Sequence, residues 1–484
     1  MAKPDAFLDL LDSPPAPAEP MAYEALPNTL RPALSVLAEH VLRRGSGQNN
    51  SVRRLIEAIN ADIDAALGEQ LNLVLHHPEF QALESSWRGI HFLVRNTATD
   101  NMLKIRLLDI SQRELGRTLR KFRGTAWDNS PIFKKIYEEE YGQLGGEPFG
   151  VLVGDYYFDH QPQSVQLLSD MAAIAAAAHV PFIAGAAPSV MDMDSWSELA
   201  NPRDLTRIFQ TPGYADWRAL RAAEDSRYLG LCLPRMLTRL PYGPETDPVE
   251  DFAFQEMVEG ADVSRYAWTN SAFALAANIA RSFSLYGWCT RFHGLETGGI
   301  VEDLPVLHFA TADGDVDTRC CTEIALNERR EAELSRLGFI TLVHRKNTGL
   351  AAFISAHSLQ KPTEYEDPAA SANALMSARL PYLFGCCRFA HYLKCLVRDK
   401  VGGTKSRPQL AMWLTDWLDG YVDHSPSTSS EDWKAAHPLE EAEVALEELP
   451  DKPGQYDARF FLKPHYQLEG LTVALRLVSR LPAA

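Results

Sequence analysis

The chain has 484 residues, of which 46% are apolar and 23% are charged, and its formal net charge is −17 at pH 7. This length and apolar content are sufficient for a buried core and for more than one domain. The acidic balance argues against a general affinity for nucleic acid and for anionic membranes, because both attract Lys and Arg.

The first 50 residues are predicted to form a flexible tail. A Pro/Ala-rich linker at 13–20 follows a short amphipathic segment in which Phe7, Leu8 and Leu11 share one helical face. Such a segment is either a frayed terminus or a short motif that folds into a groove of another protein. The tail has no apolar signal core, so we expect a cytoplasmic chain whose seven cysteines are reduced thiols.

Helical periodicity begins after this tail. Two helices are predicted over 51–75 and 78–96, and Pro78 separates them. Residues 101–110 alternate between apolar and polar like a strand. No apolar run reaches the roughly 18 residues of a membrane span, so we expect no direct membrane insertion.

Strands and helices then alternate. Short apolar strands are predicted over 149–153, 181–186 and 228–233, with an Ala-rich helix over 164–178 between the first two. This order favours an α/β fold with a partly parallel sheet. A long buried helix is predicted over 264–286.

The C-terminal part differs from the body. Helices are predicted over 369–401 and 408–421, and strands follow over 444–449, 456–462 and 471–478. Three short strands at a terminus need other strands to pair with, because an open edge is an aggregation hazard.

Motifs of catalysis and of cofactor binding are missing from the sequence. It contains no G-x-x-x-x-G-K-[ST], G-x-G-x-x-G, G-x-S-x-G or H-E-x-x-H pattern. We therefore predict no catalytic, cofactor-binding or metal-binding residues.

One dense charge cluster has two interpretations. Arg221 and Asp225 are four residues apart on a predicted helix, and Arg227 can form a fork-shaped pair with a carboxylate, so a structural ion-pair network is favoured. The alternative is a hydrolase that uses Glu224 and Asp225 as acid and base. The cluster consists of Arg218, Arg221, Glu224, Asp225 and Arg227.

A resemblance to one family runs in order from about Ser51 to Pro482. Its motifs include Leu75-His76-His77-Pro78-Glu79-Phe80, Glu140-Tyr141-Gly142, Ala178-His179-Val180-Pro181-Phe182-Ile183 and Arg388-Phe389-Ala390-His391-Tyr392-Leu393-Lys394. The sequence is similar to the large subunit of the contractile sheath of the bacterial type VI secretion system, the TssC/VipB family.

The resemblance implies a structural protein with a mixed α/β, contractile tail-sheath-like core. The implied organisation is a flexible tail with a short helix over 1–50, an α/β sheath body over 51–365, and C-terminal helices with interlocking β-strands over 366–484. The implied partners are the small sheath subunit (TssB/VipA), neighbouring copies, the Hcp inner tube, the baseplate and the AAA+ unfoldase ClpV. Sheath contraction would propel the tube and its spike and so deliver effectors.

Two sets of residues receive roles from this resemblance. Phe7, Leu8, Leu10 and Leu11 resemble the N-terminal helix that the unfoldase recognises. The C-terminal strands resemble those that complete sheets of neighbouring subunits, with Val444, Leu446, Phe460, Leu462, Val473, Leu475 and Leu477 as their residues. A sheath protein of a phage-tail-like injection device is the alternative, since it shares the mechanics but not the partners.

Overall fold

The computed structural model describes most of the chain beyond the N-terminal tail. The described residues are 35 and 52–480, without 202, 251, 259–262, 311–315, 401–406, 449–455 and 466–474. None of the helices within them is long and apolar enough to cross a membrane.

The chain divides into two compact units. The first consists of residues 1–82 and 240–266, and the second of residues 83–239 and 267–484. The first unit contains α3 (Val52–Leu75). Near the C-terminal end of this helix, the side chain of Asn72 bonds to the 240–266 segment. Its Nδ2 donates to the carbonyl of Gln255 at 3.3 Å, and its Oδ1 accepts from the backbone amide of Met257 at 2.7 Å.

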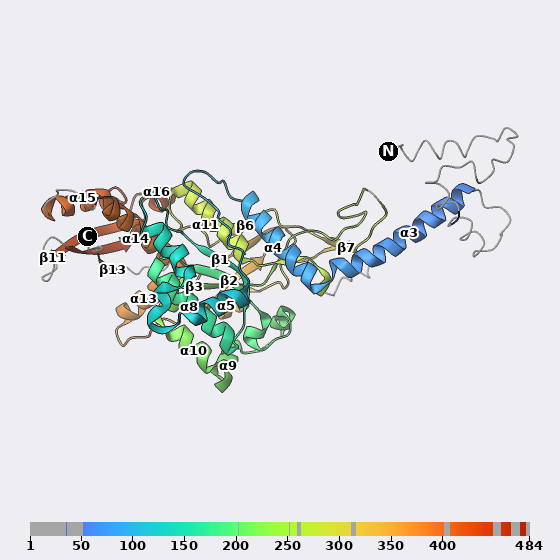
Figure 1. The fold of residues 1–484 in the computed structure, drawn as a ribbon, viewed down its shortest axis with the longest axis horizontal. Helices are drawn as coiled ribbons and strands as arrows, with labels where there is room; N and C mark the ends of the chain where they lie inside the picture. The colour runs from blue at the N-terminus through green and yellow to red at the C-terminus, as the bar shows by residue number, and fades with distance from the viewer. Residues whose placement is uncertain are drawn as a thin grey trace. The chain divides into compact units, whose positions relative to one another are not determined.

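The second unit is built around a six-stranded sheet with the strand order β1-β2-β3-β9-β10-β6 (Figure 1). The first four strands in this order are parallel, and β9, β10 and β6 are antiparallel. The predicted α/β fold with a partly parallel sheet is therefore confirmed. The strands are β1 (Leu152–Phe158), β2 (Phe182–Ala186), β3 (Leu229–Leu233), β6 (Ile300–Val301), β9 (Phe339–His344) and β10 (Ala351–Phe353).

Both faces of this sheet are buried. Successive strand residues point to opposite faces, so Phe182 and Phe339 enter one apolar core while Ile183 and Ile340 enter another. This explains why the strands are continuous apolar runs. The first core receives α5 (Gln112–Lys121), α8 (Pro162–Ala178), α9 (Leu205–Gln210), α10 (Ala215–Ala222) and α12 (Glu328–Arg336); the second receives α4 (Pro78–Arg95), α11 (Ala272–Tyr286) and α14 (Leu380–Lys400).

Short elements complete the second unit. Their bounds are α6 (Pro131–Phe133), α7 (Glu139–Tyr141), β4 (Met236–Leu237), β5 (Trp268–Thr269), β7 (His308–Ala310), β8 (Val316–Thr318), α13 (Pro368–Ser377), α15 (Arg407–Asp419) and α16 (Glu431–Ala436). Among them, β4 pairs with β5 and β7 pairs with β8 in two small antiparallel sheets.

Two predicted elements are wrong. Residues 101–110 form no strand, and Leu107 and Leu108 are exposed next to each other, so their alternation does not mark a buried face. The helix predicted over 264–286 begins only at Ala272. Asn270 interrupts it: its Oδ1 accepts from the amide of Ala272 at 3.0 Å, and its Nδ2 donates to the carbonyl of Gly154 in β1 at 3.4 Å.

Candidate functional site

The last three strands form a separate antiparallel sheet with β12 in its centre. They are β11 (Leu439–Glu448), β12 (Tyr456–Pro464) and β13 (Leu475–Arg480). The register places Val444, Phe460 and Leu477 in one row across the sheet, and Ala442, Leu462 and Leu475 in another. Leu446 lies opposite Ala458, while the predicted strand residue Val473 lies outside the described residues.

One face of this sheet covers an apolar core that α14 and α15 also enter. The fully buried Phe460 and Leu462 of β12 pack with Leu414 and Leu418 of α15. Figure 1 shows α15 beside the strands of this sheet. Burial of large apolar side chains is the main stabilising contribution here, at about 25 cal/mol for each Å² removed from water.

Trp288 joins this core from a distant part of the chain. It is buried directly after α11, and its ring stacks on that of Phe389 in α14 with centroids 4.2 Å apart. An edge-to-face contact with Tyr421 has a centroid distance of 5.2 Å. The sequence contains no local signal for this role, since Trp288 precedes β11 by about 150 residues.

β11 starts five residues before its predicted beginning. Leu439 at its start is buried, and Glu441 and Glu443 are strand residues. Lys463 of β12 supplies part of the compensating charge, with Nζ 3.3 Å from Glu440 and 3.9 Å from Glu441. The segment is therefore both acidic and part of the sheet.

The loop between α15 and α16 fixes the ends of two strands. The amide of Asp423 donates to the carbonyl of Leu439 at 2.8 Å, and the amide of His465 donates to that of Pro438 at 2.9 Å. The side chains of Asp423 and His465 are buried 3.8 Å apart. Burial lowers the pKa of His465, and the nearby carboxylate of Asp423 opposes this shift.

Two edges of the sheet remain open within the described residues. β11 and β13 each pair with β12, and the other side of β11 has one bridge, between Leu439 and Val422. Unpaired N–H and C=O groups along such edges are a template for a strand of another chain. This is the feature of the described structure most suited to assembly.

The charge cluster is arranged differently from the prediction. α10 ends at Ala222, so Arg221 and Asp225 do not share a helix, and their predicted pairing is wrong. Arg221 is buried and donates to the carbonyls of Leu359 at 3.0 Å and Arg336 at 3.2 Å. The unsatisfied carbonyls of a loop and of a helix end attract the guanidinium more than the distant carboxylate does.

The remaining members of the cluster have separate contacts. Arg218 donates to the carbonyls of Phe209 and Thr211 at 2.8 and 2.7 Å. Arg227 lies 3.9 Å from Glu224, whose side chain is 87% exposed. Burial raises the pKa of Asp225, and the charge of Arg227 opposes this shift. An exposed carboxylate and a loose ion pair do not resemble an acid–base pair held around a substrate.

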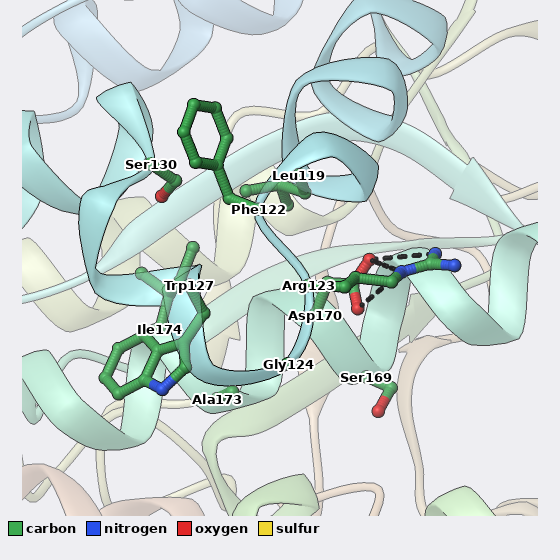
Figure 2. Close-up of a pocket in the computed structure, with 10 residues that line it drawn as sticks. All are labelled: Leu119, Phe122, Arg123, Gly124, Trp127, Ser130, Ser169, Asp170, Ala173 and Ile174. Atoms are coloured by element: carbon green, nitrogen blue, oxygen red, sulfur yellow. Dashed lines mark hydrogen bonds and ion pairs between the residues drawn. The ribbon is translucent and has the colours of Figure 1, made fainter.

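A cavity of about 150 Å³ lies between the end of α5 and α8. Figure 2 shows Arg123 and Asp170 facing each other there, with Nε 3.0 Å from Oδ2. Gln166 also donates to Asp170 at 3.0 Å, so the charged groups of this cavity are already paired. Among the described residues, no group of three or more His, Cys, Asp or Glu is arranged to hold a metal ion.

The predicted unfoldase-recognised residues Phe7, Leu8, Leu10 and Leu11 lie outside the described residues.

Known proteins match the chain over nearly its whole length. Residues 57–360 match a family model described as EvpB/VC_A0108, tail sheath N-terminal domain, and residues 369–481 match its tail sheath gpW/gp25-like domain. The type VI secretion system sheath protein TssC1 of Pseudomonas aeruginosa is 60% identical over 478 residues, which cover 99% of this chain and 95% of that protein.

A solved structure gives a much weaker match. A chain of the anti-feeding prophage baseplate, determined by cryo-electron microscopy with 6-fold symmetry, matches 80% of this chain and 81% of its own length. The TM-score is 0.34 and the identity is 11%, values too low to support a conclusion.

The sequence matches decide between the interpretations. A hydrolase and a phage-tail-like device are both set aside, because the family is one of structural sheath proteins and the 60% identical relative serves type VI secretion. The chain belongs to the TssC (VipB/EvpB) family of type VI secretion system contractile sheath proteins.

Proposed function

We propose that this chain pairs with the small sheath subunit (TssB/VipA) and that the pairs stack into a helical tube in the cytoplasm. The tube surrounds the Hcp inner tube and begins at the baseplate. Its contraction drives the inner tube and spike outward and delivers effectors. The observation that carries this proposal is the C-terminal sheet, whose two outer edges are open in the described chain.

The two kinds of sheet suit a contractile lattice. The body sheet is buried on both faces, which makes the body a rigid unit. In the C-terminal sheet, strands added from neighbouring subunits connect the bodies through main-chain hydrogen bonds. Such connections hold while rigid bodies rotate against one another. The energy of contraction is stored in the lattice, so the proposal requires no nucleotide site in this chain.

Removal of residues 471–484 tests the proposed role of the strands. We expect the full chain, co-expressed with the small subunit, to form tubules visible by negative-stain electron microscopy. The truncated chain lacks β13 and should form none, while its body keeps the far-ultraviolet circular dichroism and cooperative unfolding of the full chain. Intact tubules from the truncated chain would refute the strand role, and a full chain that forms neither tubule nor heterodimer would contradict the proposal as a whole.

Recycling by an AAA+ unfoldase (ClpV) is a separate proposal for the N-terminal segment. Replacing Phe7, Leu8, Leu10 and Leu11 by Ala removes its apolar face. Contracted tubules of this variant should form normally but persist when ClpV and ATP are added, in a light-scattering assay. Replacing Pro14 and Pro15 by Ala is the control in the same tail. Equal disassembly rates for all three proteins would show that the unfoldase does not use this segment.

A further inference from the structure

One helix of the second unit concentrates positive charge on its outer side. Four of the ten residues of α5 are basic, and Glu114 is its only acidic residue. Leu115 and Leu119 are buried in the first core, while the four basic side chains are exposed. Because residues four, seven and eight positions apart lie on one side of a helix, these side chains form one stripe. We call this stripe the basic face of α5; it consists of Arg113, Arg117, Arg120 and Lys121.

The basic face of α5 does not serve the stability of the helix. Among the described residues, none forms an ion pair with any of its four side chains. Arg113 is four residues from Arg117, which is four residues from Lys121, and like charges at this spacing destabilise a helix. Arg113 also lies in the first turn, where the helix dipole disfavours a cation. These charges therefore point to a contact with another chain.

A loop elsewhere in the second unit has the opposite charge. Glu364, Glu366 and Asp367 lie within residues 363–369, all of which are exposed. The side chain of Tyr365 between them is 55% exposed. We call residues 364–367 the acidic loop. An exposed Tyr flanked by carboxylates suits a contact with arginines, because the ring and the negative charges both attract a guanidinium group.

The acidic loop is held in one shape by hydrogen bonds. The amide of Tyr365 donates to the hydroxyl of Ser371 at 2.8 Å, and that hydroxyl donates to the carbonyl of Tyr365 at 2.9 Å. Asp367 is the N-cap of α13, and its carboxylate accepts from the amide of Ala369 at 3.0 Å. The backbone that presents the Tyr365 ring is thus ordered before any contact, which lowers the entropy cost of binding.

We propose that the acidic loop of one copy of this chain binds the basic face of α5 on a second copy. The net charge of −17 makes closely packed copies repel one another, and this contact offsets part of that repulsion. The two surfaces differ, so a contact between them is head-to-tail and extends from copy to copy without closing into a dimer. This inference rests on the proposed function, because copies lie close together in the proposed tube.

Charge reversal on each surface tests the contact. One double variant, Arg113→Glu with Arg117→Glu, reverses the basic face. The other, Glu364→Lys with Glu366→Lys, reverses the acidic loop and leaves the cap of α13 in place. Each variant, co-expressed with the small subunit, should lower the yield of tubules about tenfold, because like charges then face each other. The measurement is pelleting of tubules with electron microscopy, at low ionic strength where charge effects are largest.

Co-expression of the two double variants with the small subunit tests whether the contact joins different copies. The first variant is then acidic at both surfaces and the second is basic at both, so alternating copies attract each other at every contact. The mixture should recover most of the wild-type yield. A contact within one chain, or with a different protein, is not restored by such mixing.

Charge-matched controls and the outcomes separate the two proposals. Arg345→Glu with Lys346→Glu, and Glu138→Lys with Glu139→Lys, make the same changes of net charge at exposed positions outside both surfaces and should leave the yield unchanged. Wild-type yield from either α5 or loop variant would overturn the proposed contact and leave the sheath role standing. Loss in both without recovery in the mixture would also overturn it. Absence of tubules from the wild-type pair would instead contradict the proposed function.

Discussion

Replacing Trp288 by Ala will loosen the C-terminal sheet and lower the free energy of unfolding by about 3 to 5 kcal/mol, the range for a buried Trp or Phe. Its indole is buried between Phe389 and Tyr421, and no small side chain can fill the space it leaves. The same core holds Phe460 and Leu462, so the loss reaches β12 directly. Urea unfolding of the purified heterodimer measures the change.

Hydrogen exchange separates this effect from general damage. We expect faster exchange in β11 and β12 of the Trp288→Ala variant and unchanged protection in β2 and β3. Trp87→Ala is the matched control, because the side chain of Trp87 is 62% exposed and its removal should change stability by less than about 0.5 kcal/mol. Equal effects of the two substitutions would show that Trp288 does not support the sheet.

Replacing Glu84 by Ala is expected to be about as damaging. Oε1 of Glu84 accepts from Nε of Arg88 at 2.7 Å and from Nε of Arg239 at 2.6 Å. The side chain of Arg239 is 6% exposed, so removing the carboxylate takes from a buried guanidinium the negative charge that Glu84 supplies. Breaking such a buried pair costs about 3 to 5 kcal/mol. Thermal and urea unfolding both measure it, and a change below about 1 kcal/mol would contradict the role of the pair.

The same carboxylate predicts a pH dependence. Burial alone would raise the pKa of Glu84, but hydrogen bonds and charge attraction from Arg239 and then Arg88 outweigh it and hold the pKa below its ordinary 4.5. Its stabilising contribution is therefore complete above pH 4.5 and is lost as the pH falls through the lowered pKa. The variant should lack this part of the acid sensitivity. The control Glu79→Ala, on the exposed start of the same helix, should retain it.

The parallel core was predictable because its pattern is local. Buried strands are short apolar runs in the sequence, and the helices that cover them begin at clear signals. Examples are Pro162 at the start of α8 and Ser111 before α5, whose hydroxyl accepts from the amide of Glu114 at 3.2 Å. The C-terminal strands were also found, because the sequence between them contains the turn signals Pro453-Gly454 and Glu469-Gly470. Their assignment to contacts between subunits stays a prediction.

The failures arise where distant contacts override local preference. Asn270 lies in an apolar run that suits a helix, yet the carbonyl of Gly154 in another strand attracts its side chain. Arg221 donates to the carbonyls of Leu359 and Arg336, more than 100 residues away, and does not pair with the carboxylate four residues away. The early start of β11 was missed because nothing near it in sequence indicates the core that buries Leu439.

The late place of β12 in the chain has a consequence for the order in which the two cores can form during synthesis. The body sheet has all its strands once Phe353 has been made, whereas the C-terminal core awaits Phe460 and Leu462 of β12. Ribosomes add about 5 to 20 residues per second, so the hundred residues between β10 and β12 take roughly 5 to 20 seconds. During that interval the nascent polypeptide has the strands of its body sheet and no C-terminal sheet, so the proposed strand contacts with other subunits form only after β12 has been made.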